Sequence, residues 1–84
     1  MKKGIAVLGS TGSIGRQTLE VCKVHPHKFK IVALSAMGNT ELLEQQIREF
    51  QPKTVIIGDE EKGKKLKERV AGLPVSVYLG NQYL

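Results

Sequence analysis

Three glycines spaced three residues apart are the clearest chemical signal in the sequence. They belong to the segment Gly9-Ser10-Thr11-Gly12-Ser13-Ile14-Gly15. In such loops glycine permits a sharp turn, leaves no Cβ between the backbone and a phosphate, and lets a helix pack closely. Unpaired amides at a helix start attract anions, and the three hydroxyl groups add further donors. We therefore predict that all seven residues form a binding site for the diphosphate of a dinucleotide.

The residues on either side of this loop form the two elements that the chemistry requires. Ile5 to Leu8 is an unbroken apolar run, which predicts a strand buried on both faces of a parallel sheet. Apolar residues then recur at helical spacing from Ile14 to about Lys23, and Pro26 ends that helix. The alternative is a tight turn without a ligand, and the strand-loop-helix context argues against it.

The rest of the chain repeats this alternation of strand and helix. We predict strands at residues 29–34, 54–58 and 75–79, helices that begin at Asn39-Thr40 and Asp59, and another helix start at Gly80-Asn81. Gln46 is the one polar residue on the apolar stripe of the helix after Asn39, and we expect it at the edge of that stripe. The pattern predicts an α/β fold, with a Rossmann-like parallel sheet of about four strands. We expect right-handed crossovers, helices on both faces and a sheet that is incomplete at its C-terminal end.

The residues after the second predicted strand indicate which coenzyme the loop accepts. They read Ser35-Ala36-Met37-Gly38-Asn39-Thr40, and no acid occurs until Glu41. NAD enzymes usually place a carboxylate here to bind the ribose 2′-hydroxyl group, and that carboxylate would repel a 2′-phosphate. The sequence therefore favours NADPH over NADH, with Ser35, Ala36, Gly38 and Asn39 as candidate contacts. Asn39 also suits the cap of the following helix, and the two roles are compatible.

Composition narrows the class of protein. The chain has 84 residues, of which 40% are hydrophobic and 25% charged, as in a soluble globular domain. No apolar run approaches the roughly 18 residues of a membrane span, so we expect no membrane partner. The single Cys22 excludes an internal disulfide framework and a cysteine metal site, which favours a cytoplasmic location.

Charge and histidine placement raise two other classes of site. The net charge of +5 arises entirely in the first thirty residues, where six basic residues accompany one acid. This favours an anionic partner, and a basic nucleic-acid-binding domain is an alternative that rests on charge alone. Tyr78 and Tyr83 are too few for a base-stacking surface, so nucleic acid is not favoured. His25 and His27 have no third ligand nearby, and we predict no metal-binding residues in the chain.

The segment from Leu8 to Leu19 resembles the opening of the 1-deoxy-D-xylulose 5-phosphate reductoisomerase family. The similarity continues through Phe29 to Leu34, Asn39 and the Phe50-Gln51-Pro52 stretch, so it covers essentially the whole chain. The resemblance implies an enzyme that rearranges 1-deoxy-D-xylulose 5-phosphate and reduces the product with NADPH and Mg²⁺ or Mn²⁺. The product would be 2-C-methyl-D-erythritol 4-phosphate, an isoprenoid precursor, and the parent enzyme is expected to be a homodimer.

The resemblance also assigns residues to parts of the coenzyme. Thr11, Gly12, Ser13 and Ile14 would line the pyrophosphate and adenosine end of NADPH, and residues 36–39 would lie beside the ribose 2′-phosphate. Many members have a lysine or arginine directly before the asparagine, where this chain has Gly38. Our hypothesis is that Arg16, or the backbone around Asn39, takes over the contact to the 2′-phosphate.

The family's metal-binding acids, substrate-phosphate site and catalytic loop correspond to positions beyond Leu84. We therefore expect residues 1–84 to be a single, partial NADP-binding Rossmann-like domain from a longer enzyme. This chain would hold no catalytic residue and would be inactive alone. A non-catalytic module that senses dinucleotides is an alternative, because it would use the same loop and differ only in the residues after Leu84.

Overall fold

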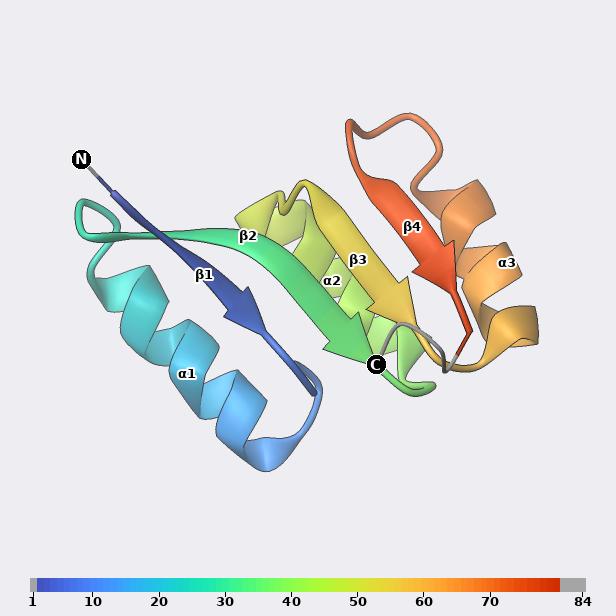
Figure 1. Cartoon of the computed structure of the whole chain (residues 1–84), viewed down its shortest axis with the longest axis horizontal. Coiled ribbons are helices and arrows are strands. Elements are labelled where there is room, and N and C mark those ends of the chain that lie inside the picture. The colour runs from blue at the N-terminus through green and yellow to red at the C-terminus, as the bar shows by residue number, and fades with distance from the viewer. Residues whose placement is uncertain (1, 81–84) are drawn as a thin grey trace.

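A computed structural model describes residues 2–80 of the chain and shows strands alternating with helices (Figure 1). In chain order the elements are β1 (Lys3–Val7), α1 (Ser13–Val24), β2 (Phe29–Ala36), α2 (Thr40–Phe50), β3 (Thr54–Ile57), α3 (Glu60–Arg69) and β4 (Ser76–Leu79). Every predicted strand and helix in this range is confirmed to within a few residues. The helix start expected at Gly80-Asn81 extends outside the described residues.

The four strands form one parallel sheet in the order β1-β2-β3-β4. The predicted α/β class and four-stranded parallel sheet are confirmed. Pairing between β1 and β2 shifts between Ile5 and Ala6, because Ile5 pairs with Ile31 and Ala6 with Ala33. Val32 is therefore an extra residue on β2, and this bulge bends the strand next to the edge of the sheet.

All three helices of the described chain lie on the same face of this sheet, which corrects the prediction of helices on both faces. Each strand pairs with the next one along the chain, and a right-handed crossover that always steps in one direction puts every helix on one side. Figure 1 shows α2 and α3 behind the strands. An ion pair from Lys23 to Glu49 joins α1 to α2, and one from Glu44 to Arg69 joins α2 to α3.

The hydrophobic core therefore has two layers. Alternate strand residues point to the helices and are fully buried, including Leu34, Val55 and Ile57. Leu43 and Ile47 of α2 pack against them from the other layer. Burying a side chain of this size stabilises the fold by about 1.5–3 kcal/mol each, so the helix-facing side supplies most of the driving force for folding.

The first strand differs from its prediction because only one of its two faces is covered in the described chain. Val7 is buried under α1, whereas Ala6 is exposed and Leu8, just beyond the strand, is 78% exposed. The unbroken apolar run from Ile5 to Leu8 was expected to be buried on both faces. Within residues 2–80 no helix covers the second face, so that expectation is wrong.

Both predicted helix caps are present. The Asn39 side chain accepts a hydrogen bond from the Leu42 amide at 3.2 Å, and the Asp59 side chain accepts one from the Lys62 amide at 3.0 Å. Each cap satisfies an amide that has no partner within its helix. The starts of α2 and α3 are therefore fixed by their own sequences.

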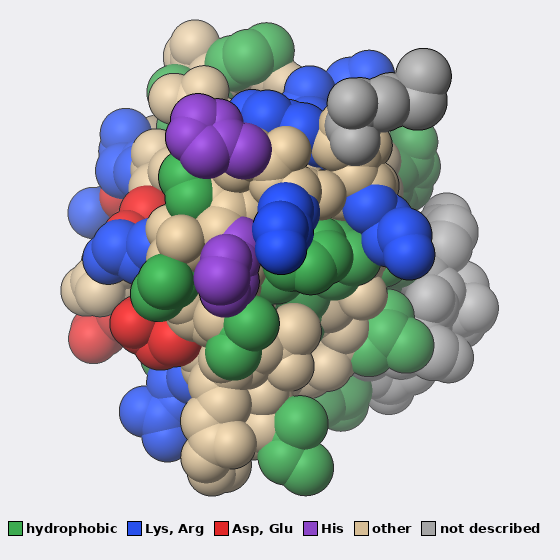
Figure 2. Space-filling model, turned by 90° about the vertical axis from the view of Figure 1, so that its left-hand side faces the viewer, with side chains coloured by type: hydrophobic (Ala, Val, Ile, Leu, Met, Phe, Trp, Pro, Cys, Tyr) green, Lys and Arg blue, Asp and Glu red, His purple; other side chains and the backbone are tan. Residues whose placement is uncertain are grey.

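The basic residues of the first thirty positions are all exposed, but they do not form one patch. Figure 2 looks onto the side of the molecule that carries β1 and α1. Lysine and arginine side chains are spread across this face between neutral groups, and acidic side chains lie beside some of them. This arrangement offers no continuous basic surface for a nucleic-acid backbone on the face shown.

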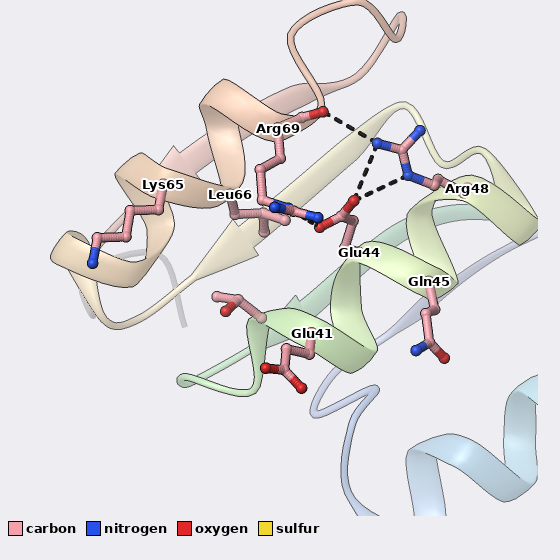
Figure 3. Close-up of a pocket in the computed structure, with 8 residues that line it drawn as sticks. Glu41, Glu44, Gln45, Arg48, Lys65, Leu66 and Arg69 are labelled. Carbon is pink, nitrogen blue, oxygen red and sulfur yellow. Dashed lines mark hydrogen bonds and ion pairs between the residues drawn. The ribbon is translucent and has the colours of Figure 1, made fainter.

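Glu44 is the central charge of the helix layer, as Figure 3 shows. Its carboxylate accepts hydrogen bonds from Arg69 of α3 and, at 3.1 Å, from Arg48 of α2. Arg48 also donates to the Arg69 carbonyl at 3.2 Å, so α2 and α3 are joined by a small network. The hydrogen bond from Arg69 lowers the pKa of Glu44 below its ordinary value, although partial burial opposes this effect.

We expect Glu44→Gln to destabilise the protein by about 1 kcal/mol or less at pH 7, because both arginine partners are largely exposed to solvent. A lowered pKa means that Glu44 contributes stability above its unfolded pKa of about 4.3 and loses it as the pH falls through the lower, folded pKa. The gap between variant and wild type should therefore begin to narrow as the pH falls below about 4.3 and should close only below the folded pKa of Glu44. Denaturant unfolding at several pH values measures this.

Glu68→Gln is the matched control, because Glu68 is exposed on α3 and forms no ion pair among residues 2–80. It should change stability little at any pH. Equal effects of the two substitutions would contradict the role assigned to Glu44.

Candidate functional site

The glycine loop connects β1 to α1 at the carboxyl ends of the parallel strands. Ligands of open α/β sheets bind at this edge. Gly9 has φ +66°, a conformation that favours glycine, and it makes the sharp turn that the sequence predicts. Gly12 is extended, at φ −80° and ψ 174°, and stands directly before the first turn of α1.

Hydrogen bonds of the buried Ser10 hold the glycine loop in place. Its side chain is 0% exposed, and its amide donates to the Ser35 carbonyl at 2.8 Å. Its hydroxyl group donates to Gln46 Oε1 at 2.7 Å, and its carbonyl accepts from Gln46 Nε2 at 2.8 Å. The Gly9 amide donates to the Ser35 hydroxyl at 3.1 Å. The loop is thus tied to β2 and to α2 by four hydrogen bonds, two of them through one glutamine.

These contacts bear on three expectations. The Ser10 hydroxyl group is buried and donates to Gln46, and the Ser35 hydroxyl group is buried and accepts from the Gly9 amide, so both groups position the loop. Gln46 is 5% exposed and does not lie at the edge of its apolar stripe. A single polar residue within an apolar stripe was the signal for this role, since a buried amide side chain requires polar partners.

The loop still offers amide groups that no protein atom occupies. Within residues 2–80, the amides of four residues make no hydrogen bond: Thr11, Ser13, Ile14 and Gly15. Gly12 donates to the Gly9 carbonyl at 3.0 Å and is not free. The first turn of α1 contains no acid and no side-chain cap. The donor set therefore suits an anion, because unpaired amides and the positive end of the helix dipole point the same way.

Gly15 allows the first turn of α1 to pack closely against the glycine loop. A Cβ at Gly15 would lie 2.2 Å from the Gly9 carbonyl oxygen and 2.7 Å from Ser10 Cα. The predicted close approach is confirmed, but the partner is the backbone of the loop. Any larger side chain at this position would push the helix start away from the turn.

The second predicted segment, residues 36–39, lies next to the glycine loop at the end of β2. Ala36 is buried, Gly38 is half-buried, and the Asn39 side chain is used as the helix cap. Met37 is exposed. A shallow apolar hollow of about 280 Å³ opens beside it and is lined by Leu8, Gly9, Ser35, Ala36 and Met37. The structure thus brings the two predicted segments together around one hollow.

The other parts of the described chain contain a pocket, but no cluster of metal ligands and no helix that could span a membrane. No group of three or more His, Cys, Asp or Glu residues among positions 2–80 is arranged to hold a metal ion. A pocket of about 510 Å³ between α2 and α3 includes the Glu44 ion-pair network, and none of its lining residues belongs to the glycine loop (Figure 3). No helix in the described range is both long and apolar enough to span a membrane.

Comparison with known proteins gives a consistent result. The sequence profile of the 1-deoxy-D-xylulose 5-phosphate reductoisomerase family matches residues 5–84. The enzyme of that name from Phocaeicola vulgatus is 51% identical over 80 residues, which is 95% of this chain and 21% of the relative. The one from Moorella thermoacetica is 48% identical over 84 residues, covering 100% of this chain and 22% of the relative. The chain thus spans about a fifth of the length of these relatives.

Solved structures show the same similarity. The 1-deoxy-D-xylulose 5-phosphate reductoisomerase of Zymomonas mobilis, solved in complex with NADPH, has a TM-score of 0.92 and 30% identity, over 99% of this chain and 22% of that one. A DOX-P reductoisomerase in complex with NADPH, fosmidomycin and magnesium has a TM-score of 0.89 and 30% identity, over 96% and 20% of the two chains.

We expect Gln46→Leu to destabilise the protein by about 2 kcal/mol, because it leaves the Ser10 hydroxyl and carbonyl groups buried without their partner. Gln45→Leu is the matched control at the neighbouring exposed position and should change stability by no more than about 0.5 kcal/mol. Denaturant unfolding of the two variants measures the difference. Equal losses would show that Gln46 does not support the loop.

Proposed function

Since the chain belongs to the 1-deoxy-D-xylulose 5-phosphate reductoisomerase family, we propose that it forms the amino-terminal part of the NADPH-binding domain of such an enzyme. The enzyme would convert 1-deoxy-D-xylulose 5-phosphate to 2-C-methyl-D-erythritol 4-phosphate for isoprenoid precursor synthesis. Relatives of known structure bind NADPH and magnesium, which supports the coenzyme and metal expected from the sequence.

The observation that carries the proposal is the set of four unpaired amides at the glycine loop. Thr11, Ser13, Ile14 and Gly15 would donate to the pyrophosphate of NADPH, and the hydroxyl groups of Thr11 and Ser13 lie in the same turn. Ser10 and Ser35 would act indirectly, by holding the loop in the shape that exposes these amides. The first turn of α1 contains no acidic residue that would repel the phosphates.

The segment at the end of β2 would contact the adenosine half of the coenzyme. The apolar hollow beside Leu8 and Met37 suits a flat aromatic ring such as adenine. Ala36, Gly38 and Asn39 lie where the ribose is bound in Rossmann-like sheets. NADPH supplies the hydride for the reduction, and the residues of this chain would bind and orient its adenosine and diphosphate.

The remaining expectations are part of the same proposal. The divalent metal and the phosphorylated sugar would be bound by residues outside this chain, because positions 2–80 offer no cluster of metal ligands. We also propose that the enzyme is a homodimer and that it is located in the cytoplasm. The buried, unpaired Cys22 supports a reducing compartment.

Titration of the natural protein with NADPH, NADH and a short DNA duplex at two salt concentrations tests the proposal. We expect saturable binding of NADPH, weaker binding of NADH, and little binding of the duplex. A duplex bound more tightly than either coenzyme, with strong salt dependence, would contradict it. NADPH oxidation on addition of 1-deoxy-D-xylulose 5-phosphate distinguishes the enzyme from a sensing module, which would bind NADPH without turnover.

Ser13→Pro tests the amide contact directly, because it removes one donor at a position that tolerates proline. Ser13 is the first residue of α1, where proline suits the helix, and Gly12 before it already has the extended backbone that proline requires. We expect roughly tenfold weaker binding of both NADPH and NADH, since a hydrogen bond to a charged group is lost.

Ser13→Ala is the matched control, because it removes the hydroxyl group and keeps the amide. It should weaken binding less than Ser13→Pro, and thermal unfolding should show that both variants remain folded. Unchanged coenzyme affinity in Ser13→Pro would mean that this amide does not contact the diphosphate.

A further inference from the structure

Gly38 lies in the loop between β2 and α2, beside the glycine loop. The connection is direct: the hydroxyl group of Ser35, three residues earlier, accepts a hydrogen bond from the Gly9 amide at 3.1 Å. In sheets of this kind the residues at the end of the second strand face the adenosine ribose. A side chain that recognises a 2′-phosphate must therefore reach the neighbourhood of Gly38.

The side chain of Lys62, from the first turn of α3, reaches that neighbourhood. A Cβ built on Gly38 would lie 3.7 Å from Lys62 Nζ and 3.7 Å from Lys62 Cδ. These are ordinary contact distances, so the lysine side chain lies directly against the glycine. Because position 38 has no side chain, the ammonium group of Lys62 stands close to the place where a basic residue at position 38 would begin.

Backbone hydrogen bonds hold Lys62 in this position. The Gly58 amide donates to the Ala36 carbonyl at 2.9 Å, and the Asp59 amide donates to the Met37 carbonyl at 2.7 Å. The Asp59 carboxylate then accepts from the Lys62 amide at 3.0 Å. The start of α3 is thus fastened to the segment that precedes Gly38.

The charge of Lys62 is available to a ligand. Lys62 is exposed and forms no ion pair in the part of the chain that the structure describes. Glu60 and Glu61 precede Lys62 directly, and no ion pair joins either of them to Lys62 within residues 2–80, while Asp59 uses one carboxylate oxygen to cap the helix. An ammonium group has three donors and no acceptor, which suits a phosphate dianion.

We propose that Lys62 binds the 2′-phosphate of NADPH and so selects NADPH over NADH. It supplies, from α3, the cation that position 38 lacks. The inference rests on the proposed function and adds a specificity-determining residue that is 24 positions away from the segment expected to hold it. It is an alternative to the hypothesis that Arg16 makes this contact.

The test is isothermal titration of the natural protein and of Lys62→Met with NADPH, NADH, adenosine 2′,5′-bisphosphate and adenosine 5′-monophosphate. We expect Lys62→Met to weaken binding of NADPH and the bisphosphate roughly tenfold or more, because a charge-assisted contact is lost. Binding of NADH and the monophosphate should not change. Lys67→Met, which removes the same charge from the last turn of α3, should leave all four affinities unchanged.

A second variant tests whether a basic side chain at position 38 can take over the role proposed for Lys62. Gly38→Lys combined with Lys62→Met should restore the preference for NADPH, because the backbone at Gly38 does not have a positive φ and a Cβ there makes only ordinary contacts, to Lys62 and to Asp59 Cβ at 3.9 Å. Far-ultraviolet circular dichroism shows whether each variant is folded.

An unchanged ratio of NADPH to NADH affinity in Lys62→Met would overturn the inference. Loss of the preference in Arg16→Ala, with Lys62→Met unaffected, would overturn it in favour of Arg16. If the wild-type protein binds neither coenzyme, the proposed function itself fails, and this inference fails with it.

Discussion

The shape of the glycine loop depends on one buried serine. A loop built from small residues has few side chains to pack, so hydrogen bonds must define its path. Ser10 supplies them through its amide, its hydroxyl group and its carbonyl, to one strand and one helix. Because these bonds use only the first amides of the loop, the later amides at the start of α1 remain available. Within the seven residues of the glycine loop, some backbone amides therefore form hydrogen bonds that fold the chain, and others remain free to bind a ligand.

Much of the fold could be predicted because its signals are local. A cap, a proline stop or an apolar run is written in consecutive residues, and Asn39 and Asp59 cap their helices as expected. The order of the strands is not local, because each crossover could step to either side. Because the steps run in one direction, none of the helices within residues 2–80 lies on the second face, and the apolar run at Ile5–Leu8 did not reveal this.

The candidate site shows the same division. The turn at Gly9 and the close approach at Gly15 follow from the glycine spacing. The partner of Ser10 lies 36 residues away in the sequence, and Lys62 lies 24 residues beyond Gly38. Neither pairing has a spacing that a periodic pattern could reveal. The distribution of charge along the sequence did not indicate Lys62 either. It places the excess of basic residues in the first thirty positions, whereas the fold brings Lys62 to the β2–α2 loop.

The steady order of the strands has a consequence for the coenzyme as a whole. In open α/β sheets a ligand crevice forms where neighbouring crossovers leave in opposite directions, and residues 2–80 contain no such reversal. The glycine loop thus follows a strand that lies at a free edge of the described sheet. A further strand laid parallel to β1 would satisfy that strand's unpaired backbone groups and create the reversal in the same step.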